Sequence, residues 1–182
     1  MSTIELVPPD LDHLAGYEAA LAAGWSPDTG RDVSREQLAL LRQDRAEFLR
    51  ILTDPDRLVV LPDGRHVPRL PFRLYWMSDG AFCGSINLRW LPGSEDLPPH
   101  VSGHIGYSVV PWKRRRGYAT AALRQLLPVA RKVGLARVLI TCDDDNLASR
   151  GVIERNGGVF AGTKADLFKT GLTKLLFWVP TS

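Results

Sequence analysis

The feature of this 182-residue chain that most restricts its fold is a run of four basic residues between a predicted strand and a predicted helix. Residues 102–110 have the composition of a β-strand, which Pro111 ends. The run Lys113-Arg114-Arg115-Arg116 follows, and Gly117 begins a stretch whose apolar residues recur at helical spacing. The first N–H groups of a helix have no partner within it, and with the helix dipole they attract anions. We therefore expect an anion site at this turn, large enough for a pyrophosphate.

The rest of the sequence predicts one domain built from a sheet and flanking helices. Ser34 and Gln37 have the spacing of a capping box at the start of one helix, and Pro128 predicts a kink in another. The order of the elements predicts an α/β fold with a mixed sheet, and the length suits a single domain over residues 1–182. Strands are expected at residues 58–61, 72–77, 82–90, 102–110, 138–142 and 172–179, and helices at 10–24, 34–52, 117–134 and 147–156.

Composition excludes several other classes of protein. Hydrophobic residues make up 45% of the chain and charged residues 24%, so a disordered or coiled-coil chain is not expected. No apolar run approaches the roughly 20 residues that cross a bilayer, and the first residues lack the pattern of a signal peptide. We therefore expect a cytoplasmic protein without a membrane partner. Cys83 and Cys142 are too few for a disulfide scaffold, and no cysteine–histidine spacing suggests zinc.

Two charged clusters have alternative interpretations. The basic run could meet nucleic-acid phosphates, but it is confined to one turn and the formal net charge of the chain is only +3, so no nucleic-acid partner is expected. Three consecutive aspartates at residues 143–145 could bind a metal, although a solvated turn before a helix is the more ordinary reading. We expect no metal site.

Two segments together resemble a known family. The arrangement Arg114-x-x-Gly117-x-Ala119 resembles the acetyl-CoA signature of the GNAT N-acetyltransferase superfamily, and Asn146 with residues 152–158 looks like the second cofactor segment of that family. The resemblance is specific over residues 103–158 and implies a GNAT fold. In that fold a mixed, mostly antiparallel sheet has splayed central strands, and the pantetheine arm of acetyl-CoA occupies the gap between them.

The resemblance also implies roles for individual residues in binding acetyl-CoA. The backbones of Val109 and Val110 would bind the pantetheine arm, and an N–H near Val110 would polarise the thioester carbonyl. Asn146 would lie beside the arm, although a role as a helix N-cap is equally open. The cofactor-binding residues expected in this way are Val109, Val110, Arg114, Arg115, Arg116, Gly117, Tyr118, Ala119, Thr120 and Asn146.

The sequence also offers candidates for the catalytic residues. An amine attacks a thioester only after losing its proton, and His104 lies near the position where several family members carry a Glu or His base. It could equally be an ordinary strand histidine. Many members have a tyrosine seven residues after the asparagine to protonate the leaving thiolate, but this chain has Ile153 there. Ser149, four residues earlier on the same helix face, is our candidate acid, while a packing role for it remains open.

These observations favour an acetyl-CoA-dependent N-acetyltransferase. We expect the acetyl group to move to a primary amine of a small molecule or peptide by direct attack in a ternary complex. The alternative is a catalytically silent acyl-CoA-binding or regulatory module, which Ile153 favours. The sequence does not identify the acceptor amine, and a homodimer is expected from the family resemblance alone.

Overall fold

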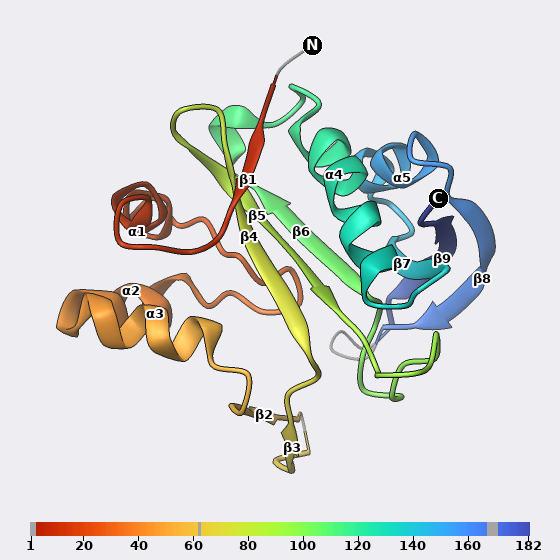
Figure 1. The fold of residues 1–182 in the computed structure, drawn as a ribbon, viewed down its shortest axis with the longest axis horizontal. Coiled ribbons are helices and arrows are strands. Elements are labelled where there is room, and N and C mark those ends of the chain that lie inside the picture. The colour runs from red at the N-terminus through yellow and green to blue at the C-terminus, as the bar shows by residue number, and fades with distance from the viewer. Residues whose placement is uncertain (1–2, 62, 167–170) are drawn as a thin grey trace.

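Two antiparallel sheets form the centre of the molecule (Figure 1). The computed structural model describes residues 3–61, 63–166 and 171–182. The first sheet has the order β1-β4-β5-β6, and its strands are β1 (Glu5–Val7), β4 (Phe72–Ser78), β5 (Phe82–Arg89) and β6 (Ile105–Val109). The second has the order β7-β9-β8, with β7 (Arg137–Asp143), β8 (Val159–Ala165) and β9 (Thr173–Pro180). A separate ribbon pairs β2 (Leu58–Val60) with β3 (His66–Pro68).

Helices cover both faces of the first sheet. On one face lie α1 (Leu14–Ala22), α2 (Ser34–Gln43) and α3 (Arg45–Thr53), and on the other lies α4 (Tyr118–Lys132), with α5 (Leu147–Glu154) beside it over the second sheet. A short 3-10 turn, η1 (Pro111–Lys113), precedes α4. The helix α4 continues through Pro128. Among the residues described, no helix has the length and apolar character needed to cross a membrane.

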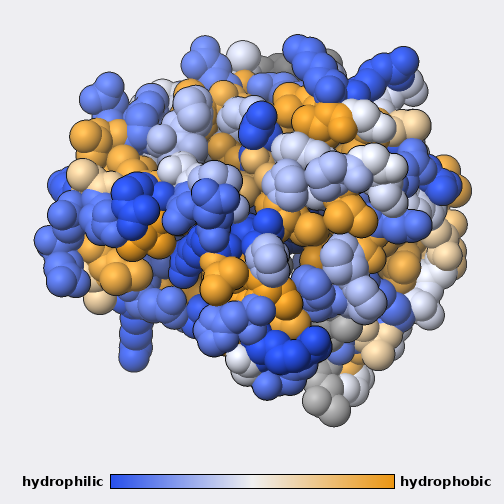
Figure 2. Space-filling model, turned by 60° about the horizontal axis from the view of Figure 1, so that its bottom comes forward, coloured by the Kyte–Doolittle hydropathy of each residue, from blue (hydrophilic) through white to orange (hydrophobic). Residues whose placement is uncertain are grey.

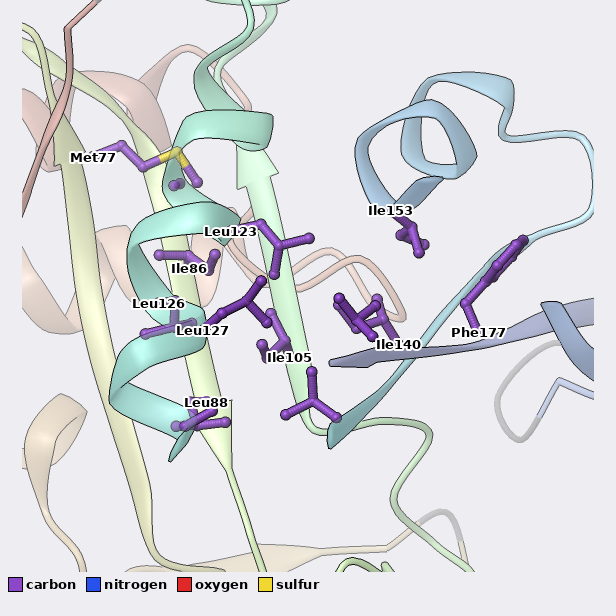
Figure 3. Close-up of a cluster of buried hydrophobic side chains, with 14 of the residues drawn as sticks. Met77, Ile86, Leu88, Ile105, Leu123, Leu126, Leu127, Ile140, Ile153 and Phe177 are labelled. Carbon is purple, nitrogen blue, oxygen red and sulfur yellow. The ribbon is translucent and has the colours of Figure 1, made fainter. Parts of the chain in front are cut away.

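The strand alternation of β5 explains why each face has its own core. Ile86 and Leu88 point towards α4, where Leu123 and Leu126 meet them in a cluster that extends to Ile140 on β7 (Figure 3). A second cluster on the opposite face contains Tyr17, Trp25 and Trp76, and the ring of Tyr17 stacks on that of Trp76 with centroids 4.8 Å apart. The first sheet is therefore covered by a hydrophobic core on each face.

The two sheets meet at one end of β6. The N–H of His104 donates to the carbonyl of Leu139 at 2.7 Å, and the N–H of Leu139 donates back to Nδ1 of the His104 ring at 2.9 Å. Beyond this joint no ladder connects β6 to β7 in the parts of the chain that are described. The predicted α/β fold with splayed central strands is thereby confirmed.

Several local predictions need correction. The expected helix over residues 34–52 is two helices, because Asp44 adopts an extended conformation and its side chain caps α3 by accepting from the N–H of Glu47. The capping box is also wrong: the Ser34 hydroxyl donates to Asp32, and the side chain of Gln37 accepts from the hydroxyl of Tyr17. The strands β1, β3 and β8 were not expected, since β1 and β3 are too short to show alternation and β8 is mostly exposed.

Candidate functional site

A cavity of about 2720 Å³ opens where β6 and β7 diverge. Its walls include β6, the carboxyl end of β7, the basic turn and the start of α5. It continues over the face of the first sheet towards α1, α2 and the β2–β3 ribbon. The cavity therefore joins the expected cofactor segments to a region between the sheet and the N-terminal helices that a second substrate can enter.

The basic turn has the backbone of an anion cradle. Gly117 is the N-cap of α4 and has φ +80°, and Arg115 has φ +61°. Arg115 is the one residue other than glycine with positive φ in the described part of the chain. Left-handed residues in a turn direct successive N–H groups towards one point, which suits a phosphate. A Cβ atom at Gly117 would meet nothing within 4 Å, so the space in front of the helix is open.

A carboxylate that the sequence analysis did not single out anchors this turn. Asp79, in the turn between β4 and β5, accepts from Lys113 Nζ at 2.5 Å and from the Tyr118 hydroxyl at 2.6 Å. These hydrogen bonds hold the pKa of the Asp79 carboxyl well below its usual range. The side chains of Lys113 and Tyr118 are thus used within the protein, and Tyr118 faces an anion only through its backbone. The only sequence signal for Asp79 is the run Ser78-Asp79-Gly80, whose residue types are typical of a turn between two strands.

Alternation along β6 determines which backbone groups face the cavity. The N–H of Arg89 donates to the carbonyl of His104, and the N–H of Val110 donates to the carbonyl of Cys83. In an antiparallel ladder the residues between such pairs direct their backbone groups the other way. Tyr107 and Val109 therefore present theirs to the gap beside β7. This free edge is a template for an extended ligand.

The structure does not bring Val110 to this edge. Its N–H is bonded to Cys83 within the sheet, its side chain is buried in the second hydrophobic cluster, and it does not line the cavity. Val109 does line the cavity, and its carbonyl accepts from Arg114 Nε at 3.1 Å. The backbone groups that face the gap therefore belong to the residues on either side of Ser108, and the N–H of Val110 is not among them.

The candidate acid Ser149 has a partner across the cavity. The Tyr107 hydroxyl on β6 lies 2.7 Å from Ser149 Oγ on α5. Burial raises the pKa of Tyr107 to about 12, so this phenol keeps its proton at neutral pH. Asn146 is the N-cap of α5 and accepts from the N–H of Ser149 at 3.0 Å, which establishes its structural role. Ile153 is fully buried in the main core, and its aliphatic side chain cannot donate a proton (Figure 3).

The candidate base His104 lies outside the cavity lining. Its side chain is fully buried, Nδ1 is occupied by the N–H of Leu139, and Nε2 has no hydrogen-bond partner. Burial lowers the pKa of His104 to about 4, so the ring is neutral at physiological pH with its proton on Nε2. Neither nitrogen offers a lone pair to the cavity. The structure therefore places His104 at the joint between the sheets and does not bring it together with Ser149.

Acidic residues near the cavity form ion pairs. Asp143, at the end of β7, bonds to Lys174. No group of three or more His, Cys, Asp or Glu side chains suited to a metal ion occurs among the described residues.

Comparisons with known proteins agree with this geometry. A family model described as an acetyltransferase (GNAT) domain matches residues 5–159. Among curated proteins none matches the chain. Solved structures with a similar fold include RimL, a ribosomal-protein alpha-N-acetyltransferase in complex with coenzyme A (TM-score 0.68, 16% identity, 99% of this chain and 95% of that one). RimJ of Mycobacterium smegmatis, in complex with CoA-disulfide, matches with a TM-score of 0.63 and 22% identity over 97% of this chain and 81% of that one. The microcin self-immunity acetyltransferase MccE, in complex with acetyl-CoA and AMP, matches with a TM-score of 0.63 and 14% identity over 99% of this chain and 93% of that one.

Proposed function

Because the chain belongs to the GNAT acetyltransferase family, we propose that it transfers an acetyl group from acetyl-CoA to a primary amine by direct attack within a ternary complex. The observation that carries this proposal is the free edge of β6, which leads directly into the left-handed basic turn at the start of α4. An extended arm and a pyrophosphate need these two features at neighbouring positions. Acetyl-CoA supplies the activated acyl group as a thioester.

The backbone provides most of the proposed binding site. The N–H groups from Arg115 to Thr120 hold the pyrophosphate, and the side chains of the exposed arginines in the turn add positive charge. Tyr107 and Val109 pair with the pantetheine arm as a neighbouring strand would. One of their N–H groups polarises the thioester carbonyl, which requires no particular side chain.

The proton for the leaving thiolate comes, in this proposal, from the hydroxyl pair of Ser149 and Tyr107. Both side chains line the cavity, and the tyrosine can return a proton to the serine through their hydrogen bond. This pair takes the role that a tyrosine at the position of Ile153 has in many family members. We assign the proton of the attacking ammonium to water in the cavity, because His104 faces away from it.

Release of free thiol from acetyl-CoA, measured over a panel of amines, tests the proposal. We expect turnover with at least one amine class and slower turnover in Tyr107→Phe and Ser149→Ala. Because the two hydroxyls act as a unit, the double variant should lose little more than the slower single variant. Tyr75→Phe, a tyrosine that does not line the cavity, is the matched control and should keep wild-type turnover. Binding of acetyl-CoA by calorimetry without turnover on any amine would instead support the silent CoA-binding module.

Two expectations remain outside this test. A homodimer and a cytoplasmic location stay predictions, and sedimentation analysis with and without CoA would examine the first of them.

A further inference from the structure

Arg89, the last residue of β5, is a half-buried cation that lines the cavity without a carboxylate partner. Its Nε donates to the carbonyl of Gly103 at 2.7 Å, and no ion pair involves its guanidinium in the described part of the chain. Burial lowers the pKa of Arg89, and the carboxylate of Asp28 opposes that effect from a distance. A guanidinium remains charged under these conditions, so the cavity contains a positive charge that the protein does not neutralise by contact.

The strand beside Arg89 leaves room for its donors. Asn87 pairs with Gly106 across the ladder, and a Cβ atom at Gly106 would lie 3.5 Å from both Arg89 Nη2 and Asn87 Nδ2. The glycine thus leaves open the space beside these two side chains. The amide of Asn87 also lines the cavity and has no hydrogen-bond partner within the described ranges. Two neighbouring side chains therefore offer unpaired N–H donors to the same space.

The nearby carboxylates are already engaged, so they do not balance this charge. Asp28 accepts from the N–H of Gly30 at 2.7 Å, and Glu36 pairs with Arg31 at 2.8 Å. Both acids are exposed at the rim of the cavity.

Two further arginines add positive charge to the same wall. The guanidinium of Arg69 donates to the carbonyls at the end of α3, and Arg57 lies exposed at the rim. Figure 2, which views the molecule from the side of the β2–β3 ribbon, shows strongly hydrophilic side chains beside apolar ones on this face. The wall formed by Arg57, Arg69 and Arg89 is therefore basic.

The position of Arg89 relates this charge to the proposed reaction. Tyr107 pairs with Ile86 on β5, so its side chain is on the α4 face of the sheet. Arg89, three residues farther along β5, is on the opposite face, where the N-terminal helices lie. An acceptor that enters the cavity over the face of these helices therefore passes Arg89 on its way to the gap beside β6.

We propose that Arg89, assisted by Asn87, binds an oxyanion group of the acceptor, so that the acceptor is an amine that also carries a carboxylate or phosphate. This inference rests on the proposed acetyltransferase function. The guanidinium fork matches a planar carboxylate and also accommodates a phosphate, and the amide of Asn87 adds a donor.

Matched peptides test this inference. Three tripeptides with a free N-terminal amine and an amidated C-terminus serve as acceptors in the thiol-release assay: Ser-Ala-Glu, Ser-Ala-Gln and Ser-Ala-phosphoserine. We expect kcat/KM for at least one anionic peptide to exceed that for the Gln peptide by about tenfold, as a charge-assisted hydrogen bond provides. The Glu and phosphoserine arms distinguish the two sources of the oxyanion.

Substitutions of Arg89 test whether this residue causes the preference for anionic peptides. Arg89→Gln should reduce the ratio of kcat/KM between the anionic peptide and the Gln peptide to about one, by lowering the rate with the anionic peptide. Arg89→Lys, which keeps the charge, should retain part of the preference. Arg73→Gln removes an exposed arginine of β4 that does not line the cavity and should leave the ratio unchanged. An equal preference in wild type and Arg89→Gln, or equal rates with all three peptides, would overturn the inference.

A binding measurement separates this inference from the proposed function. Calorimetric titration of the same peptides into the protein saturated with CoA reports the preference without turnover. If no peptide is acetylated but the anionic peptides bind more tightly to wild type than to Arg89→Gln, the transferase proposal fails and the oxyanion site stands. If acetyl transfer occurs but the anionic peptides bind no more tightly than the Gln peptide, the oxyanion site is refuted while the transferase proposal stands.

Discussion

The buried ring of His104 should make the stability of the protein depend on pH between about 4 and 6.5. Burial lowers the pKa of His104 from 6.5 to about 4 in the folded protein. Below pH 6.5 the unfolded chain binds a proton that the folded protein resists, so the stabilising contribution is complete above pH 6.5 and is lost as pH falls towards 4. Integrating these two values gives a loss of about 2.5 kcal/mol between pH 7.5 and pH 4.5.

Urea unfolding at several pH values measures this effect. The His104→Asn variant can accept from the N–H of Leu139 through Oδ1 but does not titrate, so its stability should lack this component of the pH dependence. His66→Asn, at an exposed position on β3, is the control and should retain it. The relevant quantity is the difference between wild type and His104→Asn in the slope of the free energy of unfolding against pH, because the carboxyl groups of the chain titrate equally in both proteins. Parallel stability curves for these two proteins would refute the reasoning.

Three further substitutions probe the site and its support. Gly84→Ala should lower the free energy of unfolding by about 2 kcal/mol or more in urea titrations. The reason is that Gly84 has φ +149° and that a Cβ atom there would lie 2.2 Å from the carbonyl oxygen of Ser108. The control Gly80→Ala, at φ +96° with open space around it, should lower the free energy of unfolding by less. Asp79→Ala should weaken CoA binding about fivefold in calorimetry, because it removes the acceptor of the two side chains that anchor the basic turn, and unchanged affinity would contradict that role. Arg115→Gly keeps the left-handed backbone and removes one charge, so it should preserve stability while reducing both CoA affinity and its dependence on salt.

Periodicity predicted the elements whose burial is regular. The apolar face of α4 and the continuous apolar run of β7 were visible in the sequence because each packs into the main core. The basic turn was found because a glycine at a helix start and adjacent charges are local features. The break at Asp44 was missed because the apolar spacing continues across it, although an aspartate three residues before Glu47 has the character of an N-cap.

Pairings between distant residues could not be predicted in the same way. Alternation along a strand does not reveal which of its faces meets a cavity, so the sequence left His104 open as a base and as an ordinary strand histidine. Tyr107 and Ser149 are 42 residues apart and meet only because β6 and α5 flank the same gap. Arg89 has no motif around it, and its significance depends on Gly106 in the neighbouring strand and on the absence of a carboxylate partner in the described structure.

The joint at His104 explains how one strand can belong to a sheet and also offer a free edge. A backbone ladder continued along β6 and β7 would occupy the N–H and carbonyl groups of Tyr107 and Val109 and would close the cavity. Here the ring nitrogen of His104 accepts the N–H of Leu139, so that donor is satisfied without a further rung between the backbones. The strands are then free to diverge, and one hydrophobic cluster packs α4 against both sheets. The residue first considered for proton transfer thus contributes to the site through the shape of the cavity.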